Sequence, residues 1–224
     1  MARKRRAQAV SASPGRGPDW QAIGAWCAII LVYVLLRLHL VQVPLDRDEG
    51  AFAFIGDRLI HGDLPYRDWC DLKPPGVFYC YALAAAVLPR TAVGVHLFLH
   101  LWNLVTLVVL ASLGKALAGK RAGRWSAFFY ALVSGAASHQ GFTASAEMLA
   151  LLPLVASFRL FLAGRGAAGL QGALWMAASG AAGAFAGWIK QPAALSLLII
   201  PLYHLVEGGW ARKLSLLKDA AWWL

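Results

Sequence analysis

The residues whose types and spacing best suit chemistry lie in one stretch, from Asp46 to Gly76, which reads DRDEGAFAFIGDRLIHGDLPYRDWCDLKPPG. In a chain that is 59% hydrophobic, this stretch carries seven of the eleven acids, Asp46, Asp48, Glu49, Asp57, Asp63, Asp68 and Asp71. Two motifs stand out within it: the adjacent carboxylates Asp48 and Glu49, and Lys73 followed by two prolines. Because the stretch lies between apolar segments, these charges can meet water and a polar substrate rather than hydrocarbon.

A carboxylate pair beside a lysine suits the transfer of a group from a lipid phosphate to a hydroxyl. Asp48 or Glu49 would take the proton of the acceptor as a general base, or would bind a divalent metal ion that lowers the pKa of the acceptor. Lys73 or Lys190 would stabilise the phosphate as negative charge builds on the leaving oxygen. Structural interpretations stay open beside these: Asp48 as the N-cap of a helix over residues 49–60, and Lys190 as an anchor at the membrane interface.

Two residues near the start of a later apolar run are candidates to support this chemistry. Glu147 stands where a helix is expected to begin, a place where a carboxylate also favours the helix dipole. His139 precedes it in a polar loop, where a plain surface histidine is the competing interpretation. His96 and His100 are four residues apart but have no carboxylate near them in sequence, so we expect them to pair within the helices rather than to bind a metal.

The elements that must position these residues are apolar runs of about 15–23 residues, close to the ~20 residues that a helix needs to cross a bilayer. The sequence therefore predicts an all-α polytopic membrane protein with about six transmembrane helices. We expect them at residues 20–41, 91–113, 125–137, 146–163, 170–189 and 192–206. The formal charge of +10 is spread over the short loops between these runs, which favours a role in membrane orientation over binding to nucleic acid.

Residues 1–19 form a basic tail ahead of an apolar run that is too long for a cleaved signal peptide, so we expect the tail to be cytoplasmic and the acidic stretch to face outward. Residues 74–89 would reach only ~24 Å as a helix, against a hydrocarbon core of ~30 Å. They are expected to lie in the interface, as is the helix at 49–60. This topology brings Asp48, Lys73, Glu147 and Lys190 to one outer face.

The stretch from Asp46 to Gly76 resembles the first outer loop of the GT-C membrane glycosyltransferases. This superfamily contains the protein O-mannosyltransferases, the lipid A aminoarabinose transferase and related bacterial enzymes that use polyprenyl-phosphate sugars. The later stretches GFTASAEMLALLPLVASFRLFLAGR and GWIKQPAAL are similar to the usual continuation of that family. The resemblance extends from about residue 36 to residue 201.

The resemblance implies a GT-C fold in a bacterial-type inner membrane and an inverting transfer from a polyprenyl-phosphate-linked sugar to a hydroxyl acceptor. It makes Asp48 the catalytic or acceptor-orienting carboxylate, with Glu49 supporting it or a metal. Lys73 would lie near the donor phosphate, and Glu147 matches an acid at the start of the fourth span. Family members are usually considerably longer, so residues 20–224 are expected to be the N-terminal membrane module of such an enzyme, truncated at its C-terminus.

Two other functions are compatible with the same residues. The first is a non-catalytic membrane subunit that keeps the fold and binds a lipid-linked sugar or a partner chain. The second is a transporter with Glu147 and Lys190 as groups within the membrane, which would predict internal repeats and broken helices. The sequence shows no convincing repeat, and both charges fall near the ends of spans, so the transporter ranks last. The sugar and the acceptor are left open.

Overall fold

The computed structural model describes residues 19–136, 141–200 and 202–203. In this part of the chain the elements are helices, and a single β-bridge joins Pro65 and Trp69. The expected all-α class is therefore confirmed for the described residues. The expected cytoplasmic tail, apart from residue 19, and His139 lie outside them, as does the end of the expected sixth span.

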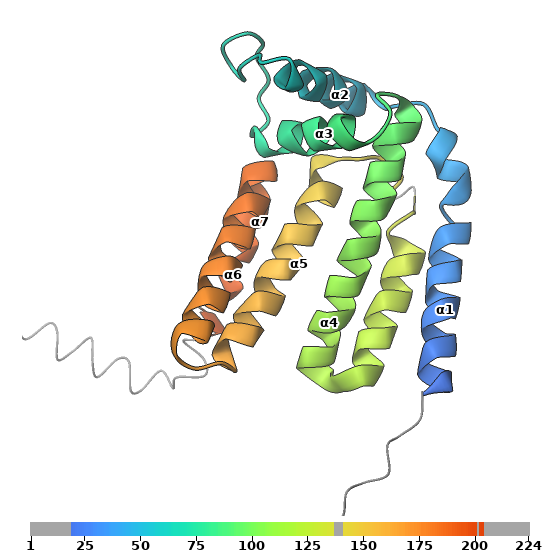
Figure 1. Ribbon diagram of the computed structural model, residues 1–224, viewed down its shortest axis with the longest axis vertical. Helices are drawn as coiled ribbons and strands as arrows, with labels where there is room; N and C mark the ends of the chain where they lie inside the picture. The colour runs from blue at the N-terminus through green and yellow to red at the C-terminus, as the bar shows by residue number, and fades with distance from the viewer. Residues whose placement is uncertain (1–18, 137–140, 201, 204–224) are drawn as a thin grey trace, which may run out of the picture.

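Most of the helices run side by side in a bundle, and two lie across one end of it (Figure 1). In chain order the elements are α1 (Trp20–Leu35), the short 3₁₀ helix η1 (Leu38–Gln42), α2 (Arg47–Ile60), α3 (Gly76–Val87), α4 (Ala92–Val133), α5 (Ala146–Arg165), α6 (Gly169–Ile189) and α7 (Gln191–Ser196). We call the end of the bundle that α2 and α3 cover the crossed end.

Among the described residues, three segments are long and apolar enough to cross a membrane: Trp20–Gln42, Ala92–Val133 and Ala146–Arg165. Their length and composition suggest an integral membrane protein. The expected count of six spans is not confirmed. The 21-residue α6 is not among the three segments, since its many Gly and Ala residues contribute little hydropathy, and α7 ends after six residues.

Two of the expected spans lie within α4, which is 42 residues long and turns back on itself (Figure 1). The reversal lies at Ala118 and Gly119, where the backbone is not helical and Gly119 has a φ of +86°. A left-handed φ of this kind is readily adopted by glycine, which has no Cβ to clash. The two arms of α4 therefore form an antiparallel pair, separated by a turn at the end of the bundle opposite the crossed end.

The helices α2 and α3 pack closely on each other over the bundle. Phe52 of α2 contacts Phe78 and Tyr81 of α3 with ring centroids 5.7 and 5.6 Å apart. A Cβ on Gly56 would lie 2.7 Å from the backbone N of Ala82, so glycine is required at this crossing. With 12 residues, α3 is too short to span, and Figure 1 confirms that it lies across the helix ends as expected.

Candidate functional site

A polar cleft of about 280 Å³ lies at the crossed end, where the start of α2 meets the loop before α3 and the start of α5. Charged and polar side chains from three separate segments line it. They include Asp46, Arg47, Asp48 and Glu49 from the first segment, Lys73 from the second, and Thr143, Ser145 and Glu147 from the third. The cleft therefore collects four of the residues that the sequence predicted to be functional, the acids Asp48, Glu49 and Glu147 and the base Lys73.

Asp48 is the carboxylate that is open to a substrate. It lies in the first turn of α2, and its side chain is 45% exposed. Its Oδ2 lies 3.6 Å from Nζ of Lys73, and its Oδ1 lies 3.4 Å from Nη2 of Arg47. An accessible carboxylate in such a cleft can act as a general base toward a bound hydroxyl.

The loop before α3 holds Lys73 by its backbone and leaves its side chain partly exposed. The backbone N–H of Lys73 donates to Oδ1 of Asp71 at 2.8 Å, and the hydroxyl of Tyr66 donates to the carbonyl of Lys73 at 2.6 Å. Pro74 and Pro75 follow, and their rings restrict the backbone further. The ammonium group is thus presented to the cleft from a fixed position.

Glu147 and Lys190 form a second pair at the edge of the cleft. Glu147 follows the N-cap Ser145 of α5, and its Oε1 lies 2.7 Å from Nζ of Lys190. Lys190 does not line the cleft itself. It lies between the end of α6 and the start of α7, and its backbone is extended. The structure therefore brings Asp48, Lys73 and Glu147 together and places Lys190 beside them.

Glu49 has a different environment from its neighbour, because it is 1% exposed and both of its oxygens are engaged. Oε2 accepts from the backbone N–H of Asp46 at 2.9 Å, and Oε1 accepts from that of Ala144 at 2.5 Å. Oε1 also lies 3.3 Å from Nε2 of His96. Burial alone would raise the pKa of Glu49, but His96 and the two backbone donors hold it below its usual value. Glu49 therefore joins α2 to α4 and to the loop before α5.

His96 is the partner that sequence reasoning missed. Its ring is fully buried, with Nε2 facing Glu49 and Nδ1 lying 3.4 Å from the carbonyl oxygen of Val41. Both nitrogens face acceptors, an arrangement that suits a doubly protonated imidazole. The pair is 47 positions apart in sequence, and a lone histidine in an apolar run carries no signal for such a contact.

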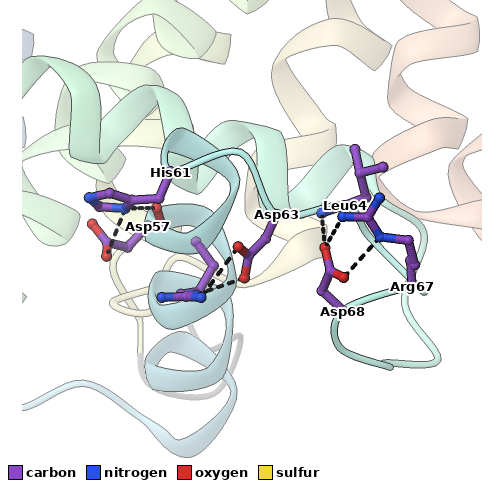
Figure 2. A network of polar contacts seen from close by, with 7 residues as sticks. Asp57, His61, Asp63, Leu64, Arg67 and Asp68 are labelled. Atoms are coloured by element: carbon purple, nitrogen blue, oxygen red, sulfur yellow. Dashed lines mark hydrogen bonds and ion pairs between the residues drawn. The ribbon is translucent and has the colours of Figure 1, made fainter.

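The other acids of the 46–76 stretch hold its loop together. Figure 2 shows Asp57 beside His61, and Asp68 accepting from Arg67 and from the backbone of Leu64. The hydrogen bond from Arg67 lowers the pKa of Asp68 to about 2. Further pairs join Asp63 with Arg58 at 2.7 Å and Asp57 with Arg90 at 2.8 Å. Much of the acid clustering is therefore structural rather than chemical.

The donor set of the cleft does not fit a divalent cation. Both oxygens of Asp48 face cationic side chains, and both oxygens of Glu49 accept from backbone N–H groups. Across the described residues, no group of three or more His, Cys, Asp or Glu side chains is arranged to hold a metal ion. We therefore derive no step through a metal, although the sequence left Asp48 and Glu49 open as ligands.

Comparisons of the chain with protein-family models, with curated proteins and with solved structures found no match. The relation to the GT-C enzymes therefore stays an expectation that rests on the quoted motifs. The chemistry of the cleft has to be argued from its own geometry.

Proposed function

We propose that the protein is a glycosyltransferase that moves a sugar from a polyprenyl-phosphate donor to a hydroxyl acceptor with inversion. One observation carries the proposal: the accessible carboxylate of Asp48 lies 3.6 Å from the ammonium of Lys73 in a polar cleft of about 280 Å³. The cleft lies at the end of helices that are apolar enough to cross a membrane. A base and a phosphate-binding cation at this place suit a donor whose tail lies in lipid and whose head is polar.

In the proposed reaction, Asp48 accepts the proton of the acceptor hydroxyl. The acceptor oxygen forms a bond to the anomeric carbon from the face opposite the phosphate, and the bond between that carbon and the phosphate oxygen breaks. The bonding electrons leave with the polyprenyl phosphate, and the proton stays on Asp48 until it passes to solvent. A single displacement of this kind inverts the anomeric configuration, and the required chemistry is general base catalysis.

Lys73 stabilises the negative charge that builds on the leaving phosphate. Lys190 is the second candidate for this role, since its ammonium lies at the edge of the cleft and is held there by Glu147 at 2.7 Å. A bound phosphate would compete with Glu147 for the ammonium of Lys190, or Lys190 would contact both anions at once. Glu49 is assigned a positioning role, because Oε1 accepts from the N–H of Ala144 and so fixes α2 against the loop that precedes Glu147.

Location follows from the charge distribution under the positive-inside tendency. The turn of α4 at the opposite end of the bundle carries Lys115, Lys120, Arg121 and Arg124, while the crossed end carries the acidic stretch. We infer that the cleft faces the outer side of a bacterial-type inner membrane and that the N-terminus is cytoplasmic.

The test is binding and turnover of a panel of short-chain polyprenyl-phosphate sugars by the purified protein. Asp48→Asn removes the base and keeps the shape, so turnover is expected to fall about 10²–10⁴-fold with donor binding retained. Lys73→Ala is expected to weaken donor binding by roughly 10-fold or more, because it removes a charge-assisted contact to the phosphate. The matched control is Asp63→Asn, in an ion pair outside the cleft, which should behave like wild type.

Donor binding without turnover in the wild type, and with no effect of Asp48→Asn, would favour the non-catalytic membrane subunit. Absence of donor binding by a folded wild-type protein would rule out the assignment of the cleft. Transport of the sugar across proteoliposomes without transfer would instead favour the transporter.

A further inference from the structure

Two neighbouring grooves lie between α1 and the arms of α4, toward the end of the bundle opposite the cleft. The first has a volume of about 420 Å³ and is lined by Ile29, Val32, Trp125 and Phe128, with Arg121 and Arg124 beside them. The second also has a volume of about 420 Å³ and lies nearer the start of α1. Arg124 lines both grooves, so they meet at its side chain.

The second groove is also mostly apolar, but more charged and polar residues line it than line the first. Lys115 and Lys120 join Arg124 there, from both sides of the α4 turn. One acid, Asp19, lines this groove too, and its Oδ1 accepts from the backbone N–H of Ala22 at 3.1 Å as the N-cap of α1. The two grooves together therefore have an excess of positive charge.

The four bases at this end have no acidic partner within the part of the chain that the structure describes. Lys115, Lys120 and Arg121 are exposed, and Arg124 is half-buried. Within the described ranges, none of the four forms an ion pair with an acid. Cations grouped at the rim of an apolar groove favour a ligand that has both an anionic group and a hydrocarbon chain.

We propose that these grooves bind an anionic diacyl phospholipid. Its phosphate would lie among Lys115, Lys120 and Arg124, and one acyl chain would follow the first groove along Ile29 and Phe128. The helices that form the grooves belong to two of the segments that are apolar enough to cross a membrane. In the proposed arrangement, both grooves would border lipid near the level of the headgroups. Basic pockets between membrane helices are known to suit anionic headgroups.

Charge complementarity selects this occupant over others. A zwitterionic phospholipid such as phosphatidylcholine would fill the apolar groove, but the cation of its headgroup would be repelled by the bases. A free phosphate would neutralise the bases but would leave hydrocarbon surface open to water. The competing account is that the bases only orient the chain in the membrane, which requires no groove and no headgroup selectivity.

The experiment measures quenching of tryptophan fluorescence by lipids with brominated acyl chains, using the delipidated full chain in detergent. Phosphatidylglycerol is expected to quench with about 10-fold or higher affinity than phosphatidylcholine, because only the former carries a net negative headgroup. Trp125→Phe should remove part of the quenched signal, since Trp125 lines the first groove. Equal affinities for the two lipids in the wild type would overturn the proposal.

Three variants separate groove binding from general charge. Lys120→Gln with Arg124→Gln removes two of the three bases around the phosphate and should reduce the affinity for phosphatidylglycerol toward that for phosphatidylcholine. Arg58→Gln with Arg67→Gln, at the crossed end, should leave the affinity unchanged. Ala28→Phe keeps every charge but fills the first groove, which Ala28 lines, so it should weaken binding of both lipids. The proposal would be overturned if neither the charge variant nor Ala28→Phe changed the affinity for phosphatidylglycerol. Full displacement of phosphatidylglycerol by inorganic phosphate would also overturn it.

Discussion

Asp48 and Glu49 are neighbours in sequence, but their side chains have opposite environments. Successive side chains in a helix point about 100° apart, so two adjacent residues can have very different surroundings. Asp48 is 45% exposed and contacts Lys73, whereas Glu49 is 1% exposed and contacts His96. The adjacent acids that the sequence presents as one motif are therefore a candidate base and a buried structural carboxylate.

Glu49→Gln is expected to destabilise the protein by about 3 kcal/mol, because it removes the charge opposite a buried histidine and turns an acceptor oxygen into a donor. The measurement is thermal unfolding in detergent. Asp48→Asn is the matched control, which should change the unfolding temperature little, since Asp48 makes only exposed ion pairs. Equal stability of the two variants would contradict the structural role of Glu49.

The same carboxylate predicts a dependence of stability on acid. The folded-state pKa of Glu49 is lowered, so its contribution to stability is present above the unfolded-state pKa of about 4.3 and is lost as the pH falls through the folded-state value. Unfolding temperatures measured from pH 7 to pH 3 should therefore decline for the wild type. Glu49→Gln should show a smaller decline over that range; parallel curves for the two proteins would contradict the assignment.

At the scale of elements, the pairing of α2 with α3 positions the cleft. Two contacts attach this pair to the loop before α5: the N–H of Ala144 donates to Glu49, and the hydroxyl of Tyr81 donates to the carbonyl of Ala144 at 2.8 Å. One residue of that loop is thus held by a side chain from each crossing helix. Glu147 follows three residues after Ala144. The packing of α2 on α3 therefore sets the position of Glu147 relative to the start of α2, on the other side of the cleft.

Gly56→Ala should separate α2 from α3, since its Cβ would lie 2.7 Å from the backbone N of Ala82 and 2.8 Å from Cβ of Tyr81. We expect a loss of about 1–3 kcal/mol, measured by thermal unfolding, together with reduced turnover. Gly50→Ala in the same helix is the control. It meets nothing within 4 Å, so the better helix propensity of alanine should leave stability unchanged or raise it by up to about 1 kcal/mol.

At the scale of the whole molecule, charge separates the two ends of the bundle. The crossed end carries the acidic stretch and the cleft, and the opposite end carries the four bases of the α4 turn. Figure 1 places α2 and α3 far from the turn of α4. Under the positive-inside tendency, this separation of charge favours one orientation of the chain in a membrane, with the crossed end outside.

Cysteine labelling tests this orientation. Cys70 is exposed in the loop at the crossed end, and we expect it to react with a membrane-impermeant maleimide from outside intact cells. Lys120→Cys, made with Cys27 and Cys70 replaced by alanine, should react only after the membrane is permeabilised. Cys80 is buried and serves as an internal negative control. Reaction of the residue-120 cysteine in intact cells would contradict the proposed orientation.

Periodicity and composition by themselves determined the helical class, the apolar segments, the short helix at 76–87 and the candidate cleft residues. These depend on local properties: segment length, prolines at the ends of a run, and the positions of charges between runs. The expected count of six spans is not confirmed, because the Gly- and Ala-rich α6 is not among the three long apolar segments.

Only the tertiary structure decided which acid faces the cleft and which is buried. Glu49 contacts His96 and Ala144, which are 47 and 95 positions away, and contacts across such distances depend on how the helices pack. Likewise, the side-chain positions of Lys73 and Glu147 relative to Asp48 follow from the close crossing at Gly56. Sequence pattern specifies which face of a helix is apolar, whereas the packing of one helix on another specifies which polar groups meet.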